Sequence, residues 1–365
     1  MSEFTCRRFL LADFIALQYD YAYVANVVMS MSRMNSTRIK VKAPARLHLG
    51  FMDMHGGLGR SFGSLGLCLE NPATSIVVTE ADELSVNGPS ADRARKYARQ
   101  LLDWFNARDA VDIEIRSAIP EHMGLGSGTQ MSLAVGIAIT QLKGINTTIE
   151  DIAAALGRGA RSGIGIGAFK YGGFVVDGGR GEDTHVPPVI SCMTFPDEWR
   201  ILLLLDHARE GMHGRAEADA FNALPKMNDV TVDHLCRILV MQVLPALAEK
   251  NCTAFGDGIT EIQNCVGDHF SHAQGGRYAS RDVARVLEWA AARNGATGIG
   301  QSSWGPAGFV IFPSETQAYQ TLKQARKAFS ELTAIEYLVT GARNQMAEVY
   351  LNESKLSSRL NFNKI

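Results

Sequence analysis

The sequence has few cysteines and no pair of them at metal-binding or redox spacing. None of the six lies in a C-x-x-C motif, so neither a zinc site nor a redox dithiol is indicated. With 365 residues, 46% of them hydrophobic, the chain can bury a sizeable core without disulfide staples. We therefore expect reduced thiols and a cytoplasmic location. The cysteines are Cys6, Cys68, Cys192, Cys236, Cys252 and Cys265.

A strong charge of either sign is also missing. The chain has 36 Lys and Arg residues against 38 Asp and Glu residues, for a formal net charge of −2. Such a balance gives no general attraction to nucleic acid or to an anionic membrane, so we expect neither as a partner. Any specificity for a phosphorylated ligand must come from a local group of residues.

Long apolar runs are absent near the N-terminus. Residues 9–31 are fairly apolar, but Asp13 and Asp20 interrupt them well before the roughly 18 residues that a membrane helix needs. No clear signal-peptide cleavage site follows. We predict that residues 1–37 form an extension outside the catalytic fold.

Several common catalytic motifs are absent as well. The chain has no G-x-x-x-x-G-K-[ST] phosphate loop, no H-E-x-x-H zinc motif and no G-x-S-x-G nucleophile elbow. Gly163, Gly165 and Gly167 precede an expected strand, which argues against a dinucleotide-binding fold. The acidic pair that grips ribose in the usual phosphoribosyltransferases is missing too.

The most informative segment present is a glycine-rich turn at residues 120–130. Its glycines allow a tight backbone turn, and an apolar helix is expected from Met131 to Leu142. Unpaired amides and the positive end of the helix dipole would then converge on one spot, as in phosphate sites. We predict that this turn binds phosphate through Gly124, Leu125, Gly126, Ser127, Gly128, Thr129 and Gln130.

Strand and helix patterns alternate irregularly along the rest of the chain. The expected strands include 38–43, 75–78, 111–116, 173–176, 201–206, 309–312 and a final one at 334–339. The expected helices include 91–105, 232–249, 254–266, 280–294 and 314–329, and a capping pattern starts another at Thr148. This mixture favours an α+β fold. We predict an N-terminal domain over 38–195, a C-terminal domain over 196–345 and a tail over 346–365.

The glycine-rich turn resembles the second motif of the GHMP kinase superfamily, P-x-x-x-G-L-G-S-S. The first motif has its counterpart at residues 44–50, and the third at 298–306. The resemblance implies a two-domain α+β fold with the active site between the domains. Two positions depart from the kinases: Gly165 stands where they usually carry a catalytic Asp, and Gly128 where they carry a Ser that often binds magnesium.

Further segments resemble the β-ribofuranosylaminobenzene 5′-phosphate synthases, a GHMP-fold family of methanopterin biosynthesis. They are residues 46–53, 66–67, 161–169, 171–179 and 300–306. The resemblance implies transfer of a phosphoribosyl group from phosphoribosyl pyrophosphate to 4-aminobenzoate or 4-hydroxybenzoate, with loss of CO₂ and pyrophosphate. It also implies a homodimer, and the pyrophosphate implies Mg²⁺, whose ligands the sequence does not identify.

Individual residues in these segments are candidates for roles in the reaction. The catalytic candidates are Asp53, Arg46 and His48, of which Arg46 and His48 alternate on one strand and can face one side. The substrate-binding candidates are Arg161, Ser162, Gln301, Ser302, Ser303 and Trp304. Four of them have a plainer reading: Asp53 as a turn former, Arg46 as a surface arginine of a strand, His48 as a structural histidine and Trp304 as part of the core. Residues 206–221, which include Glu217, are interpreted as a lid or an interdomain loop.

Two other functions remain open from the sequence. The first is an ATP-dependent small-molecule kinase of the same fold, and the second is a non-catalytic sensor of a phosphorylated metabolite. Turnover of phosphoribosyl pyrophosphate against turnover of ATP would separate the synthase from the kinase. Binding without turnover would identify the sensor.

Overall fold

The computed structural model describes residues 37–107, 110–212, 214–293 and 295–356. Nearly all of the expected N-terminal extension therefore lies outside the described residues. The strands are β1 (Arg38–Asp53), β2 (Phe62–Glu80), β3 (Ser85–Asn87), β4 (Val111–Ser117), β5 (Phe174–Asp177), β6 (Val189–Met193), β7 (Arg200–Asp206), β8 (Thr297–Gln301), β9 (Ala307–Phe312), β10 (Ile335–Thr340), β11 (Glu348–Leu351) and β12 (Ser354–Lys355).

The helices cover both sheets formed by these strands. They are α2 (Ala91–Trp104), α3 (Ser127–Lys143), α4 (Ile149–Ala155), α5 (Ile164–Lys170), α6 (Gly214–Ala223), α7 (Asp229–Ile238), the π-helical turn η1 (Leu239–Val243), α8 (Leu244–Ala248), α9 (Cys252–Gln274), α10 (Arg281–Ala291) and α11 (Glu315–Ala328). Mixed sheets and helices confirm the predicted α+β class.

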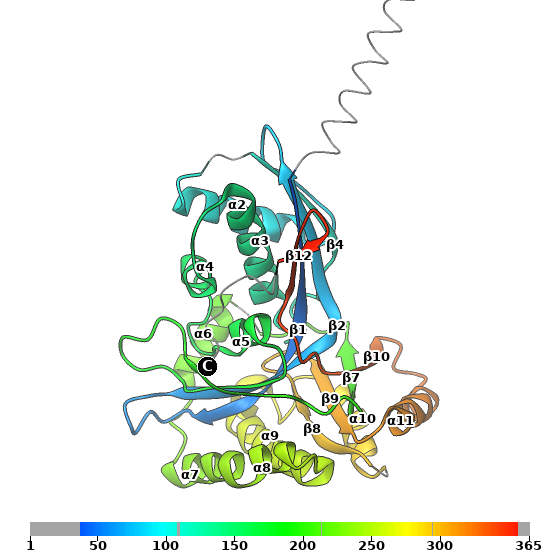
Figure 1. The fold of residues 1–365 in the computed structure, drawn as a ribbon. Helices are drawn as coiled ribbons and strands as arrows, with labels where there is room; N and C mark the ends of the chain where they lie inside the picture. The colour runs from blue at the N-terminus through cyan, green and yellow to red at the C-terminus, as the bar shows by residue number, and fades with distance from the viewer. Residues whose placement is uncertain (1–36, 108–109, 213, 294, 357–365) are drawn as a thin grey trace, which may run out of the picture.

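The larger sheet has eight strands, with β12-β11-β1-β2-β4-β3 as its main order and β5 and β6 attached beside β2. Strands β1 and β2 form its long central pair, and helices α2, α3 and α4 lie against one face (Figure 1). The register between β1 and β2 shifts twice, between Pro44 and Arg46 and between His48 and Gly50. Such bulges redirect side chains and are frequent next to active sites.

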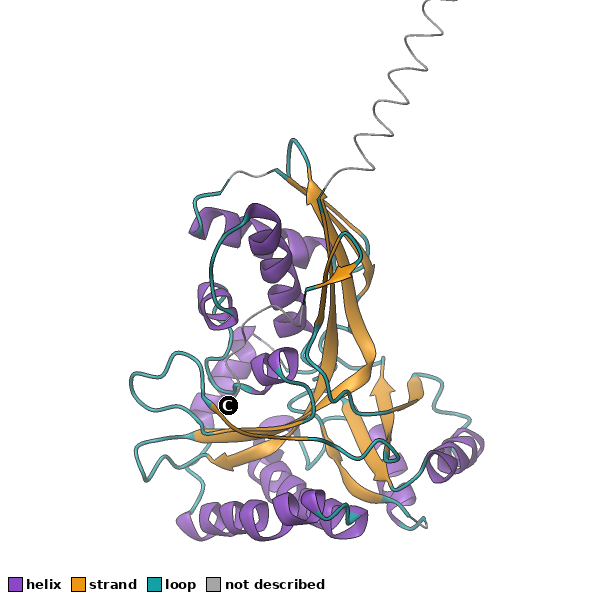
Figure 2. Cartoon of the chain, in the orientation of Figure 1, coloured by secondary structure: helices purple, strands orange, loops and turns teal. Residues whose placement is uncertain are grey.

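The smaller sheet has the antiparallel order β10-β7-β9-β8. Its strand β7 is apolar almost throughout because helices cover both faces (Figure 2). Ile201, Leu203 and Leu205 pack into the core that α9 shares with the larger sheet. Leu202 and Leu204 point the other way, toward α10 and α11. The first of these two cores contains residues of both sheets, together with Met123 and Leu125 of the glycine-rich turn.

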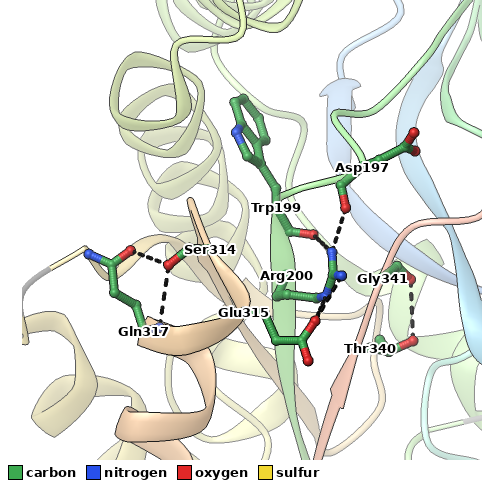
Figure 3. A network of polar contacts seen from close by, with 8 residues as sticks. All are labelled: Asp197, Trp199, Arg200, Ser314, Glu315, Gln317, Thr340 and Gly341. Carbon is green, nitrogen blue, oxygen red and sulfur yellow. Dashed lines mark hydrogen bonds and ion pairs between the residues drawn. The ribbon is translucent and has the colours of Figure 1, made fainter.

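The start of β7 is tied to helix α11 by an arginine. Arg200 donates to the backbone carbonyl of Trp199 at 3.0 Å and pairs with Glu315 at 2.9 Å (Figure 3). Glu315 lies in the first turn of α11, where a carboxylate also favours the helix dipole. This network therefore fixes the start of β7, an inner strand of the smaller sheet, against α11.

Several predicted elements are confirmed and others are corrected. The helix at 91–105 and the capping box at Thr148, whose hydroxyl accepts from the amide of Asp151, are both present. Residues 164–170 form a helix rather than a glycine-rich lead-in to a strand, and residues 297–301, at the start of the third motif, form strand β8. The strand at 335–340 is not the last, because β11 pairs with β1.

The predicted domain limits remain a prediction. The chain passes from the larger sheet to the smaller one between β6 and β7, on either side of residue 195. Part of the expected tail, residues 348–355, contributes β11 and β12 to the larger sheet.

One run in the described part of the chain, Asp229–Ala248, is long and apolar enough to cross a membrane by length and composition alone. It comprises α7, η1 and α8. Leu235, Val243 and Leu247 of this run are buried in the core, while Met241 on the other side is exposed. This two-sided pattern is typical of a helix that lies on a protein core. The five cysteines within the described residues are unpaired.

Candidate functional site

The glycine-rich turn forms the N-terminus of helix α3. Gly126 is its N-cap residue with φ +80°, a left-handed conformation that favours glycine. The first intrahelical bond runs from the amide of Gln130 to the carbonyl of Gly126 at 3.0 Å. The amides of Ser127, Gly128 and Thr129 precede that bond and have no partner within the helix. The turn therefore has the free helix N-terminal amides that an anion site requires.

The three motif segments meet through one buried hydroxyl. Ser302 Oγ accepts from the amide of His48 at 2.9 Å and donates to the carbonyl of Gly124 at 2.7 Å. The amide of Ser303 also donates to the carbonyl of His48, at 3.3 Å. Because Ser302 is fully buried, these bonds position the three segments rather than a ligand.

A cavity of about 460 Å³ opens over the glycine-rich turn; we call it the loop cavity. It is lined by residues 126–129 of the turn and by four cations from three segments: Arg46 on β1, Arg93 and Lys96 on α2, and Arg158 after α4. Among the described residues that line it, Glu217 on α6 is the only carboxylate. This excess of positive charge fits a ligand that carries several negative charges.

Arg46 and His48, two of the three predicted catalytic residues on β1, differ in their charge. Burial lowers the pKa of Arg46 to about 10, and nearby Glu217 opposes that shift, so Arg46 remains a cation at neutral pH. Its Nη1 donates to the carbonyl of Gly124, and its Nε is enclosed without a partner. Burial, together with Arg46 and Arg161, lowers the pKa of His48 to about 3. His48 is therefore a neutral imidazole in the folded protein.

Arg158 is a half-buried cation of the loop cavity. Its Nη2 donates to the hydroxyl of Tyr97 on α2, and its Nε is enclosed without a partner. A Cβ placed on Gly128 would lie 3.5 Å from Arg158 Nη1, so the guanidinium directly faces the turn. Arg93 is held differently, by Glu121 at 2.7 Å.

A second cavity of about 400 Å³ is lined by the C-terminal end of α6; we call it the aromatic cavity. Its walls include Phe62 and Phe221, and Arg161 is also part of its lining. Arg161 Nη2 lies 3.0 Å from Glu217 Oε2, and its guanidinium stacks on Phe221 with 4.4 Å to the ring centroid. Because Glu217 lines the loop cavity, the two cavities meet at this ion pair.

Asp53 and Ser162 occupy structural positions. Asp53 Oδ1 accepts from the amides of His55 and Gly56 at 2.7 and 2.8 Å, which is a turn-forming role, and Asp53 lines neither cavity. Ser162 Oγ donates to buried Asp177 at 3.3 Å. Burial raises the pKa of Asp177, although its carboxylate also accepts from three backbone amides.

Gln130, Gln301 and Trp304 are buried among protein groups. Gln130 Nε2 donates to the carbonyl of Gly165 at 2.8 Å. Gln301 Oε1 accepts from the amide of Ala279 at 2.6 Å. Trp304 is 3% exposed and packs on Phe270 with 4.4 Å between ring centroids, although its edge reaches the loop cavity. Of the substrate-binding candidates, Arg161, Ser303 and Trp304 line a cavity over the site.

Sequence reasoning missed most of the cations of the loop cavity. Arg93, Lys96 and Tyr97 share one face of α2, and their i, i+3 and i+4 spacing was a usable signal. Arg158 and Phe221 carried no comparable local signal. The sequence places Glu217 only within a possible lid. Its ion-pair partner Arg161 lies 56 positions earlier in the chain, so no local pattern connects the two.

Thr129 fills the space beside Gly165, the position where GHMP kinases usually carry a catalytic Asp. Gly165 lies on α5, and a Cβ placed there would come within 2.9 Å of Thr129 Cγ2. A larger side chain at 165 would therefore displace the first turn of α3. Within the described residues, no cluster of three or more His, Cys, Asp or Glu residues could form a metal cage.

Comparison with known proteins agrees with this geometry. Residues 92–173 match the GHMP kinases N terminal domain, and residues 243–331 match the GHMP kinases C terminal family. The solved structure of mevalonate diphosphate decarboxylase from Staphylococcus aureus superposes with a TM-score of 0.61 at 15% identity, over 86% of this chain and 97% of that one. Phosphomevalonate kinase from Streptococcus pneumoniae gives 0.61 at 13% identity, over 84% and 100%. These structures establish the fold.

Archaeal relatives are more similar in sequence. The beta-ribofuranosylphenol 5'-phosphate synthase of Archaeoglobus fulgidus is 32% identical over 325 residues, covering 85% of this chain and 99% of the relative. The protein of the same name from Methanocaldococcus jannaschii is 34% identical over 251 residues, covering 61% and 76%. The chain therefore belongs to the beta-ribofuranosylphenol 5'-phosphate synthase family, a group of pentosyltransferase enzymes with the GHMP kinase fold.

Proposed function

We propose that this enzyme joins phosphoribosyl pyrophosphate to 4-hydroxybenzoate, or to its 4-amino analogue, with loss of CO₂ and pyrophosphate. The product is a β-riboside 5′-phosphate with a carbon–carbon bond, a step in methanopterin biosynthesis. The observation that carries the proposal is the junction of a cationic cavity over a helix N-terminus with an aromatic cavity. The relatives are named for a ribosylphenol product, which favours the hydroxy acceptor.

The loop cavity is the proposed site of the donor's diphosphate. The amides of residues 127–129, with Arg46 and Arg158, would stabilise the negative charge that develops on the diphosphate as it leaves C1 of the ribose. Arg46 is held in place by its bond to the Gly124 carbonyl, so little reorganisation is needed at that point.

The acceptor would attack from the side opposite the diphosphate. A ring electron pair forms the bond from the carboxylate-bearing carbon to C1, and the C1–oxygen bond breaks with its electron pair leaving on pyrophosphate. The pair of the ring–carboxylate bond then returns to the ring as CO₂ departs. The ring carbon expels CO₂ rather than a proton, so the step needs no general base. Neutral His48 and the absence of an Asp at Gly165 are compatible with that requirement.

Glu217 would act at the junction of the cavities. It is the only carboxylate among the described residues lining either cavity, and it lies beside Arg161 and near Arg46. As the diphosphate leaves, C1 gains positive charge, and a fixed carboxylate stabilises that charge. The same residue is the candidate side chain for Mg²⁺, which would enter with the diphosphate and neutralise part of its charge.

The kinase alternative is disfavoured by the packing at α5. A kinase needs a group that orients or deprotonates the acceptor hydroxyl, and the place for that group is occupied by Thr129. The experiment supplies the full chain with 4-hydroxybenzoate, Mg²⁺ and either phosphoribosyl pyrophosphate or ATP. We expect pyrophosphate release that depends on the benzoate, and no ADP. ADP formation with a phosphorylated product would refute the proposal, and binding of the donor without turnover would support the sensor.

A further inference from the structure

We infer that the aromatic cavity binds the acceptor as a ring anion, and that Arg180 and Lys226 select its carboxylate. The inference deepens the proposed function and rests on it. The cavity lies between the turn that follows β1, the residues around Arg161 and Arg180, and the segment 221–226 at the C-terminal end of α6. Its volume of about 400 Å³ lies within the range of about 300–1,000 Å³ typical of small-molecule sites.

The walls of the cavity suit a flat apolar ring. Phe62 and Phe221 meet edge to face, with 6.2 Å between centroids and an interplanar angle of 83°. Met54, Leu224 and Pro225 complete the apolar lining. An aromatic ligand inserted beside these residues buries its faces and extends the existing edge-to-face cluster.

The charge of the cavity suits an anion. Three cations line it, Arg161, Arg180 and Lys226, and its described lining contains no Asp or Glu. Glu217 already pairs with Arg161 and offsets its charge. Within the described part of the chain, neither Arg180 nor Lys226 forms an ion pair, and Arg180 contributes a bond from Nη1 to the Ala160 carbonyl at 3.3 Å. The positive charge not offset by protein carboxylates therefore belongs to Arg180 and Lys226.

A third feature points to the hydroxyl of the ring. His269 lines the cavity, and its Nε2 is enclosed without a hydrogen-bond partner. Burial lowers the pKa of His269, so the imidazole is neutral at pH 7. A neutral imidazole can exchange a hydrogen bond with a phenol hydroxyl or an aniline amine. The cavity thus offers aromatic walls, cations and one neutral polar group, which together match a hydroxybenzoate.

The test compares Lys226→Met and Arg180→Met with Lys323→Met, a control at an exposed position on α11. Both cavity side chains are exposed, so the variants are expected to fold. Each should raise the KM for 4-hydroxybenzoate by about three- to tenfold, with the KM for phosphoribosyl pyrophosphate unchanged. A higher donor KM with an unchanged benzoate KM would show that the cavity holds the ribose phosphate, and unchanged values for both would also overturn the inference.

Calorimetry separates this inference from the proposed function. The wild type should bind 4-hydroxybenzoate more tightly than the neutral 4-hydroxybenzamide, and the double variant Arg180→Met, Lys226→Met should lose that preference. His269→Phe should weaken the binding of 4-hydroxybenzoate and leave the binding of benzoate, which has no ring hydroxyl, unchanged. If the enzyme makes no riboside yet shows this preference, the proposed function fails and the carboxylate site stands. If it makes the riboside and the double variant keeps the preference, the inference fails alone.

Discussion

Arg161 and Glu217 form an ion pair, with 3.0 Å between Nη2 and Oε2, at the point where the loop cavity and the aromatic cavity meet. The pair joins the segment that precedes α5 to helix α6. It also places the one carboxylate of the described lining beside the position proposed for C1 of the donor. The two residues therefore separate the proposed site of the leaving group from that of the ring.

The first prediction concerns Glu217. We expect Glu217→Gln to lower kcat by about ten- to a hundredfold, because the neutral amide no longer stabilises positive charge at C1. Steady-state kinetics with both substrates varied measures the change. The control is Asp219→Asn, an exposed position on the same helix, where Asp219 Oδ2 lies 3.8 Å from Arg215 Nε. A rise in both KM values with kcat unchanged would instead give Glu217 a purely structural role in holding α6.

The second prediction concerns Arg158. Arg158→Met should raise the KM for phosphoribosyl pyrophosphate by about tenfold or more, because a hydrogen bond to a charged group contributes about 1.5–3 kcal/mol. Tyr97→Phe, which removes the hydroxyl that accepts from Arg158, should have a smaller effect in the same direction. Arg99→Met on the same helix is the control, since Arg99 is exposed and does not line the loop cavity. Donor binding unaffected by Arg158→Met would remove Arg158 from the site.

The third prediction tests the packing that fills the kinase position. Gly165→Ala should lower the free energy of unfolding by about 1–3 kcal/mol, because the added Cβ meets Thr129 Cγ2 at 2.9 Å. Denaturant unfolding measures this cost. Adding Thr129→Ser removes the methyl group and keeps the hydroxyl, so the double variant should recover most of the lost stability. An equal loss of unfolding free energy in the single and the double variant would show that the contact with the Thr129 methyl group is not the cause.

The fourth prediction follows from the buried imidazole. The pKa of His48 is about 3 in the folded protein and 6.5 as the reference value. The unfolded chain therefore binds the proton more readily than the folded protein does. The free energy of unfolding should fall as the pH falls from about 6.5 toward 3. The slope is about 1.4 kcal/mol per pH unit.

Urea unfolding of wild type and His48→Gln from pH 7 to pH 5 measures this effect. The variant lacks the titrating group, so its free energy of unfolding should fall less steeply than that of the wild type. Parallel curves would mean that His48 titrates normally in the folded state.

The sequence contained enough local signals to predict much of the fold and the anion-binding turn. The spacing of Gly124, Gly126 and Gly128 before an apolar run predicted a turn feeding a helix, and Thr148 predicted the next helix start. Such features depend on neighbouring residues alone. The helix at 164–170 was missed because glycines are poor helix formers. These glycines have a tertiary reason, because a Cβ placed on Gly165 would lie 2.9 Å from Thr129 Cγ2 and one placed on Gly167 would lie 2.6 Å from Val175 Cγ1.

The contents of the site were harder to predict. Ser302 was expected to bind substrate, but a bond network that spans residues 48, 124 and 302 uses its hydroxyl in positioning the three motifs. Asp53 could be read equally as a ligand or as a turn former, and only the backbone amides around it show the turn. Arg158 and Glu217 reach the site through tertiary packing, which no local pattern encodes.

The most direct test of the account is the bond made to the sugar. The full-length enzyme is supplied with phosphoribosyl pyrophosphate and with 4-hydroxybenzoate isotopically labelled at the carboxylate-bearing ring carbon. Nuclear magnetic resonance of the product should show a direct coupling between that ring carbon and C1 of the ribose, with CO₂ and pyrophosphate released in equal amounts. A product that keeps its carboxylate and carries the sugar or a phosphate on oxygen would contradict the account.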